Sequence, residues 1–187
     1  MHHLNKLNYY YINEFISLGY SIPGAVVALS IIIFFTSIDS NLAKISILGG
    51  FLVYLFMLIY AYIIRFMAVG KTNLKAGFDK LPNSYDNTAK VLGLSDFNFI
   101  KKVLFPLNKL PLLSALILVF IDIMKELPIT LILRPFNFDT LATQTFEFAI
   151  DEMIPKSAIY SLSIIFICSL LLVLFKKFLD RLHVSGD

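Results

Sequence analysis

Five ionisable residues lie in or beside strongly apolar stretches in the second half of the chain: Asp122, Lys125, Glu126, Arg134 and Asp139. A charge at membrane depth is costly, so such residues are candidates for a functional site. By helical rise, Asp122 lies roughly 20 Å beyond Lys109, about two thirds of the way across a bilayer core. Lys125, one turn on, is its nearest partner. Alternatively, Asp122 only reaches the outer interface, and residues 125–128 are a structural helix end.

Catalytic and cofactor motifs are absent from the sequence. There is no G-x-x-x-x-G-K-[ST], H-E-x-x-H, C-x-x-C or G-x-S-x-G pattern. The three histidines and the single Cys168 do not suggest a metal site. The lysines fit no nucleic-acid fold signature. We therefore expect a non-enzymatic protein with no catalytic residue, no cofactor, no metal site and no nucleic-acid partner.

The elements that must position these residues are membrane helices. Hydrophobic residues make up 58% of the chain, and charged residues make up 16%, against about 25% in soluble domains. A span needs roughly 20 mostly apolar residues. Four segments approach that length, at about 18–38, 45–67, 108–126 and 157–176. The sequence therefore predicts an all-α, polytopic membrane helix bundle, with Arg65 extending to the lipid headgroups at the end of the second span.

Loop charges predict the orientation of the bundle. Loop 71–109 carries seven Lys and three Asp, whereas loop 125–156 carries three basic and five acidic residues. Basic loops stay in the cytoplasm. Loop 71–109 and both termini are thus expected inside, and loop 125–156 is expected on the outer face.

Both loops contain predicted secondary structure. In the basic loop a helix, Tyr85–Leu92, is followed by Gly93 and by a second helix, Phe97–Phe105. Ser95 and Asp96 would cap this second helix, and Pro106 and Pro111 would stop it. In the outer loop, residues 129–133 suit a non-helical re-entrant or interfacial turn. There Asp139 and Thr140 could cap a helix over Leu141–Ile150.

Apolar side chains of the basic loop, including Phe97, Phe99 and Ile100, are costly to expose to water. They either pack on the protein's own bilayer surface or insert into a soluble partner.

Residues 87–106 resemble the EAA loop in permease subunits of binding-protein-dependent ABC importers. That pattern is Glu-Ala-Ala, three residues, Gly, nine residues, Ile, one residue, Leu-Pro. The matching positions are Asn87, Thr88, Ala89, Gly93, Val103, Phe105 and Pro106. Asn87 replaces the family's Glu. The resemblance implies a cytoplasmic coupling helix that docks on a separate ATPase subunit, with Phe97 among the docking residues.

Residues 19–24, 65–69 and 125–143 are similar to the iron(III) permease branch of that family. This resemblance implies a type I importer fold in a bacterial inner membrane. In such an importer, the translocation path or outer gate would be lined by Asp122, Lys125, Glu126, Arg134 and Asp139. The partners it implies are an ATPase subunit and a periplasmic ferric-ion-binding protein, and the latter is where iron recognition is expected. The chain is similar only to the C-terminal part of the second permease half, so the missing half or spans would come from elsewhere. The alternatives are a truncated or split-gene remnant without transport activity, and a permease for another substrate.

Overall fold

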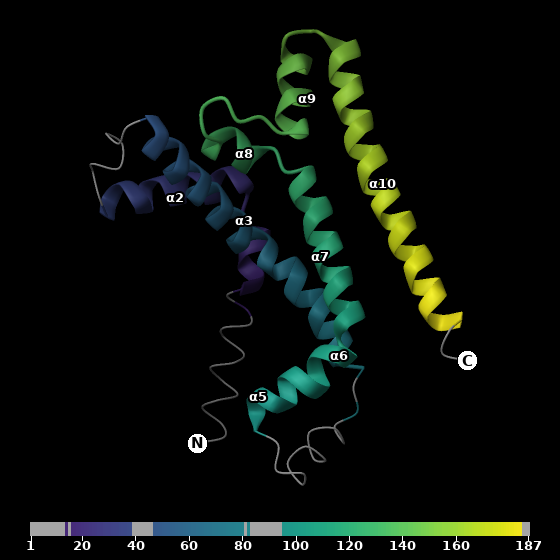
Figure 1. The fold of residues 1–187 in the computed structure, drawn as a ribbon. Coiled ribbons are helices and arrows are strands. Elements are labelled where there is room, and N and C mark those ends of the chain that lie inside the picture. Colours follow the sequence, from purple (N-terminus) through teal and green to yellow (C-terminus); the bar gives the residue numbers. More distant parts are fainter. Residues whose placement is uncertain (1–13, 15, 39–46, 81, 83–94, 185–187) are drawn as a thin grey trace.

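A computed structural model describes residues 14, 16–38, 47–80, 82 and 95–184 of the chain (Figure 1). The helices in chain order are α2 (Gly24–Ile38), α3 (Ile47–Phe78), α5 (Asp96–Phe99), a π-helical turn η2 (Ile100–Leu104), α6 (Phe105–Leu107), α7 (Lys109–Met124), α8 (Pro128–Leu133), α9 (Leu141–Ile150) and α10 (Ile154–Val184). Within these described ranges there is no strand. The predicted all-α fold is confirmed.

Two of the described helices are long and apolar enough to cross a membrane. These are Gly50–Phe78 in α3 and Ile154–Asp180 in α10. The segments Phe97–Leu107 and Lys109–Met124 meet at a bend of 72° and count as a third candidate only if they are taken together. The shorter apolar helix α2 has 15 residues. The count of four spans with the limits given above stays a prediction.

The main apolar core lies where α2, α3 and α8 meet. Its buried members are Val27, Ala28, Ile31, Met57, Leu58, Ala61, Ile129 and Leu133. Figure 1 shows α8 lying across the crossing of α2 and α3. Each fully buried Leu or Ile side chain contributes about 1.5–3 kcal/mol relative to its exposed state. Burial of this cluster therefore holds α8 against the long helix α3.

Helix α7 runs alongside the second half of α3 (Figure 1). The two helices approach closely at Gly77, where a Cβ atom would lie 2.5 Å from the side chain of Pro111 and 3.0 Å from Asn108 Oδ1. Only a residue without a side chain permits this approach.

Helices α9 and α10 form a hairpin. Ser157 Oγ donates a hydrogen bond of 2.8 Å to the carbonyl oxygen of Thr145. The rings of Phe148 and Tyr160 stack with centroids 5.4 Å apart. Glu152, at φ 60°, lies in the turn between the helices. None of the most apolar stretch of α10 is buried within the described chain, so α10 presents an apolar surface to its surroundings.

The structure differs from the sequence-based predictions at the prolines. Pro106 and Pro111 do not stop the helix that precedes the third candidate span. Pro106 lies at the start of α6, Pro111 lies in the first turn of α7, and the bend falls at Asn108. A proline in a first turn needs no N–H partner, and the wider π turn before it leaves room for its ring.

The segment 129–133 is also different from its prediction, because it forms the helix α8 rather than irregular backbone. Pro128 starts this helix in the position where proline is best tolerated.

Candidate functional site

A buried ion pair joins α3 to the turn between α7 and α8. Arg65 Nε lies 3.4 Å from Glu126 Oε2, with side-chain exposures of 17% and 8%. The two groups form an ion pair without hydrogen-bond geometry, so Arg65 Nε is buried without a hydrogen-bond partner. Desolvating two charges is costly, so such a pair persists only when further contacts satisfy both groups.

The guanidinium of Arg65 receives those contacts from the segment before α2. Its Nη1 atom donates a 2.6 Å hydrogen bond to the carbonyl oxygen of Ile22, and its Cζ atom lies 5.8 Å from the ring centroid of Tyr20. The prediction that Arg65 extends to the headgroups is therefore wrong. A carboxylate and a carbonyl oxygen within reach satisfy the cation inside the protein.

Glu126 organises the start of α8. Its Oε1 atom accepts a 3.2 Å hydrogen bond from Ile129 N, and its carbonyl oxygen accepts one of 2.9 Å from Thr130 Oγ1. The Thr130 hydroxyl has only one proton and uses it there, so Tyr62 must donate the 2.5 Å bond between the two hydroxyls. We call Tyr20, Tyr62, Arg65, Glu126 and Thr130 the Arg65–Glu126 cluster.

Gly24, the first residue of α2, packs directly on this cluster. A Cβ atom at Gly24 would lie 2.8 Å from Glu126 Oε1, 3.2 Å from Ile129 and 3.4 Å from Pro128. The absence of a side chain is thus what lets α2 approach the carboxylate.

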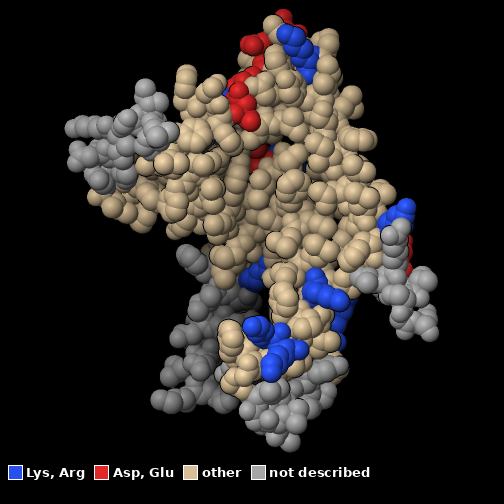
Figure 2. All heavy atoms as spheres, viewed as in Figure 1, with Lys and Arg blue, Asp and Glu red and all other residues tan. Residues whose placement is uncertain are grey.

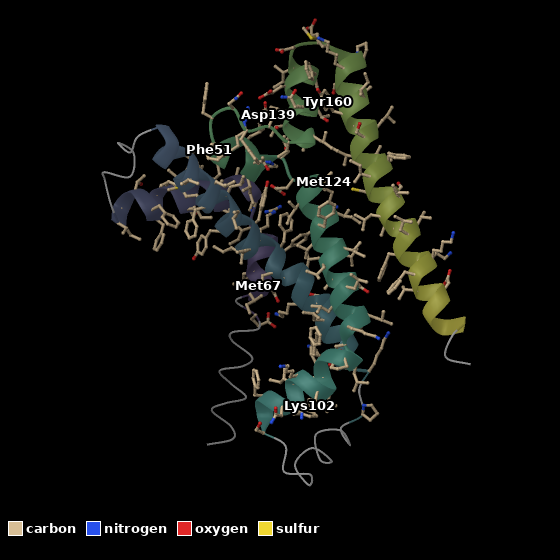
Figure 3. All side chains as sticks on the ribbon, in the orientation of Figure 1. Phe51, Met67, Lys102, Met124, Asp139 and Tyr160 are labelled. Carbon is tan, nitrogen blue, oxygen red and sulfur yellow. The ribbon has the colours of Figure 1, made fainter. Side chains whose placement is uncertain are left out.

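Asp122 and Lys125 make a separate ion pair at the end of α7. Their charged atoms are 2.8 Å apart, and their side chains are 15% and 61% exposed. The expected contact with Lys125 is present. Glu126 points elsewhere, into the Arg65–Glu126 cluster, so the three neighbouring charges divide into two sites. Figure 3 labels Met124, which ends α7 just before this division.

Arg134 bridges two carboxylates in the segment from the end of α8 to α9. Its two terminal nitrogens donate to Asp139 and Glu147, which ties the loop after α8 to helix α9. Asp139 lies in that loop in Figure 3. Thr140 caps α9 reciprocally with Thr143. The helix predicted over Leu141–Ile150 has those limits in the structure, whereas Asp139 pairs with Arg134 instead of capping.

The predicted coupling residues are only partly within the described chain. Asn87, Thr88, Ala89 and Gly93 lie outside the described residues. The other three follow one another along the segment α5–η2–α6 and do not form one cluster: Phe97 is 71% exposed, Val103 is half-buried and Pro106 is exposed. Ser95 Oγ accepts a hydrogen bond of 3.4 Å from Asn98 N at the start of this segment.

Sequence reasoning did not assign Tyr62, Arg65 or Thr130 to a site. The sequence did contain a signal for Arg65, which is a lone charge within an apolar run. A charge in such a run requires an opposite charge nearby. Within the described ranges, no three His, Cys, Asp or Glu residues are grouped so that they could hold a metal ion.

Long apolar helices around a buried ion pair define a membrane helix bundle. Residues 3–184 match the family described as the binding-protein-dependent transport system inner membrane component. The chain belongs to this family of multi-pass permeases of ABC importers, which are not themselves enzymes.

A curated relative is the Fe(3+)-transport system permease protein FbpB 2 of Haemophilus influenzae. It is 25% identical over 159 residues, which cover 85% of this chain and 30% of the relative. The chain thus spans under a third of the length of that relative. No solved structure matches the chain significantly.

Proposed function

We propose that the chain is the permease component, or part of it, of an ATP-driven importer that carries iron(III) across a bacterial inner membrane. The family and the name of the relative support this proposal. The proposed partners are a separate ATPase subunit, a periplasmic ferric-ion-binding protein, and further permease spans from another half or polypeptide.

The observation that carries the proposal is the exposed apolar face of the segment α5–η2–α6. Phe97, Ile100 and Phe105 are 71%, 54% and 58% exposed. Lys101 and Lys102 are also exposed beside them. Exposed aromatic residues of this kind act as anchors when a partner covers them. We infer that an ATPase subunit is that partner and that its movement on ATP binding is transmitted to α7.

The charge distribution supports a cytoplasmic position for this segment and for both termini. Figure 2 shows carboxylates gathered around α9, at one end of the molecule, and most basic side chains in view gathered around α5, at the other. A smaller basic patch lies beside the carboxylates. Basic segments remain on the cytoplasmic side, so the α9 end would face the binding protein.

The ion pairs at the α9 end are candidates for the translocation path or the outer gate. Asp122 pairs with Lys125 at the end of α7, Arg134 ties the end of α8 to Asp139 and to Glu147 on α9, and Glu126 holds the start of α8. We propose that these contacts rearrange when the binding protein delivers its ion.

The docking role is tested by Phe97→Ala, with Phe166→Ala as the matched control. Both side chains are highly exposed, at 71% and 67%, but Phe166 lies on α10. We expect Phe97→Ala to weaken co-purification of the ATPase subunit and to lower iron uptake at least about tenfold, as for an interface anchor worth more than about 1.4 kcal/mol. Equal effects of the two substitutions would contradict the docking role.

Uptake of radiolabelled iron tests the substrate. Cells that lack the gene should regain uptake when it is restored together with its neighbouring genes. Restored transport of another metal without iron would assign a different substrate. Normal uptake in cells without the gene would refute its role in transport and favour a remnant.

A further inference from the structure

A long groove follows one face of α3 and is closed on one side by α7. It has a volume of about 1000 Å³, and its walls include Ile59, Ile63, Phe66, Met67, Val119 and Ile123. Met67, labelled in Figure 3, lies midway along it on α3. Ligand sites usually hold about 300–1,000 Å³, so this groove accommodates a large apolar molecule.

Among the described residues that line the groove, the charged ones lie at one end. Lys71, Lys75 and Asp79 line it there, whereas the wall from Ile59 to Met67 is apolar apart from Tyr62. Lys71 Nζ donates a hydrogen bond of 2.8 Å to Ser17 Oγ, which holds the ammonium group at the edge of the groove. Two cations against one anion favour an anionic ligand head at this end.

The spacing of the two ends matches one leaflet of a bilayer. Twelve residues separate Ile59 from Lys71, which is about 18 Å along a helix axis. Half of the hydrocarbon core measures about 15 Å. An acyl chain lying against the apolar wall would therefore place its headgroup beside the lysines.

We propose that this groove is a binding site for one anionic phospholipid. Its phosphate lies between Lys71 and Lys75, and an acyl chain follows α3 toward Ile59. Basic pockets between membrane helices select acidic headgroups in this way. The proposal requires only that α3 lies in a membrane, so it is independent of iron transport and of the ATPase partner.

The test measures lipid retained by the full chain in mild detergent by native mass spectrometry. Phosphatidylglycerol and phosphatidylcholine with identical acyl chains are compared. We expect at least about fivefold greater retention of phosphatidylglycerol, because one lysine near a headgroup contributes about that factor. Equal retention of the two lipids would overturn the proposal.

Substitutions locate the site. Lys75→Gln should lower the preference for phosphatidylglycerol by about fivefold, and Lys71→Gln with Lys75→Gln should abolish it. The control, Lys176→Gln with Lys177→Gln, removes the same charge from exposed positions on α10 and should change nothing. A similar loss in this control would mean that only net charge matters, and the site would be refuted.

A further variant tests the apolar wall without altering charge. Ile63→Trp should displace both lipids, whereas Ile159→Trp on α10 should displace neither. Circular dichroism checks that each variant stays folded. In native membranes, a photoreactive group attached to the thiol of Met67→Cys, in a Cys168→Ser background, should label lipid. Labelling of another polypeptide instead would assign the groove to a protein partner and overturn the proposal.

Discussion

Replacing Glu126 with Gln isolates the charge of the buried ion pair. The amide oxygen of Gln can still accept the hydrogen bond from Ile129 N, so the start of α8 keeps its contact. The guanidinium of Arg65, whose side chain is only 17% exposed, loses its counter-ion. Removal of one partner from a buried pair typically costs about 3–5 kcal/mol. We expect about 3 kcal/mol, because the Ile22 carbonyl oxygen and the Tyr20 ring still contact Arg65.

Asp122→Asn provides a matched control one turn earlier. It makes the same chemical change in an ion pair whose lysine is 61% exposed, and it should cost less than about 1 kcal/mol. Unfolding in mixed detergent micelles, followed by circular dichroism, gives the free energy of unfolding for both variants. The chain has no tryptophan, so intrinsic indole fluorescence is not a usable signal.

A double-mutant cycle completes the test. Arg65→Gln and Glu126→Gln should each destabilise the protein, and their combination should cost about 2 kcal/mol less than the sum of the two. Additive single effects, or an Asp122→Asn variant as unstable as Glu126→Gln, would refute the interpretation of a specifically buried pair.

Gly24→Ala should destabilise the protein by about 1–3 kcal/mol, because the new methyl group would lie 2.8 Å from Glu126 Oε1. Gly70→Ala, whose methyl group would lie 3.6 Å from its nearest neighbour, should be neutral or stabilising by up to about 1 kcal/mol in the same unfolding assay. Thr140→Ala removes the reciprocal cap with Thr143 and should cost about 1 kcal/mol. Hydrogen exchange should then be faster in the first turn of α9, and unchanged exchange there would contradict the capping role.

Features set by neighbouring residues could be predicted from the sequence. Helix α9 begins after Thr140, which is a local capping signal, and α7 ends at Met124 where the apolar run gives way to charge. The family resemblance of residues 87–106 depends equally on local spacing.

Features set by distant residues could not be predicted. Arg65 and Glu126 are far apart in the chain, and nothing local shows that α8 brings them together. The π turn before Pro106 depends on how the helix fits its surroundings. The helix-breaking tendency of proline, taken alone, therefore predicted the wrong C-terminal end for that helix.

The bend at Asn108 makes the segment Phe97–Leu107 a lever arm. The arm measures about 16 Å by helical rise and leaves α7 at 72°. A rotation of about 10° about Asn108 would move the far end of this segment by about 3 Å, which is more than half the pitch of an α-helix. At this bend, Asn108 Oδ1 is buried without a hydrogen-bond partner. A small rotation that let water reach this oxygen would offset part of the free energy lost when the oxygen was desolvated. A change of angle at this joint would therefore cost less than bending a helix whose buried polar groups are all paired.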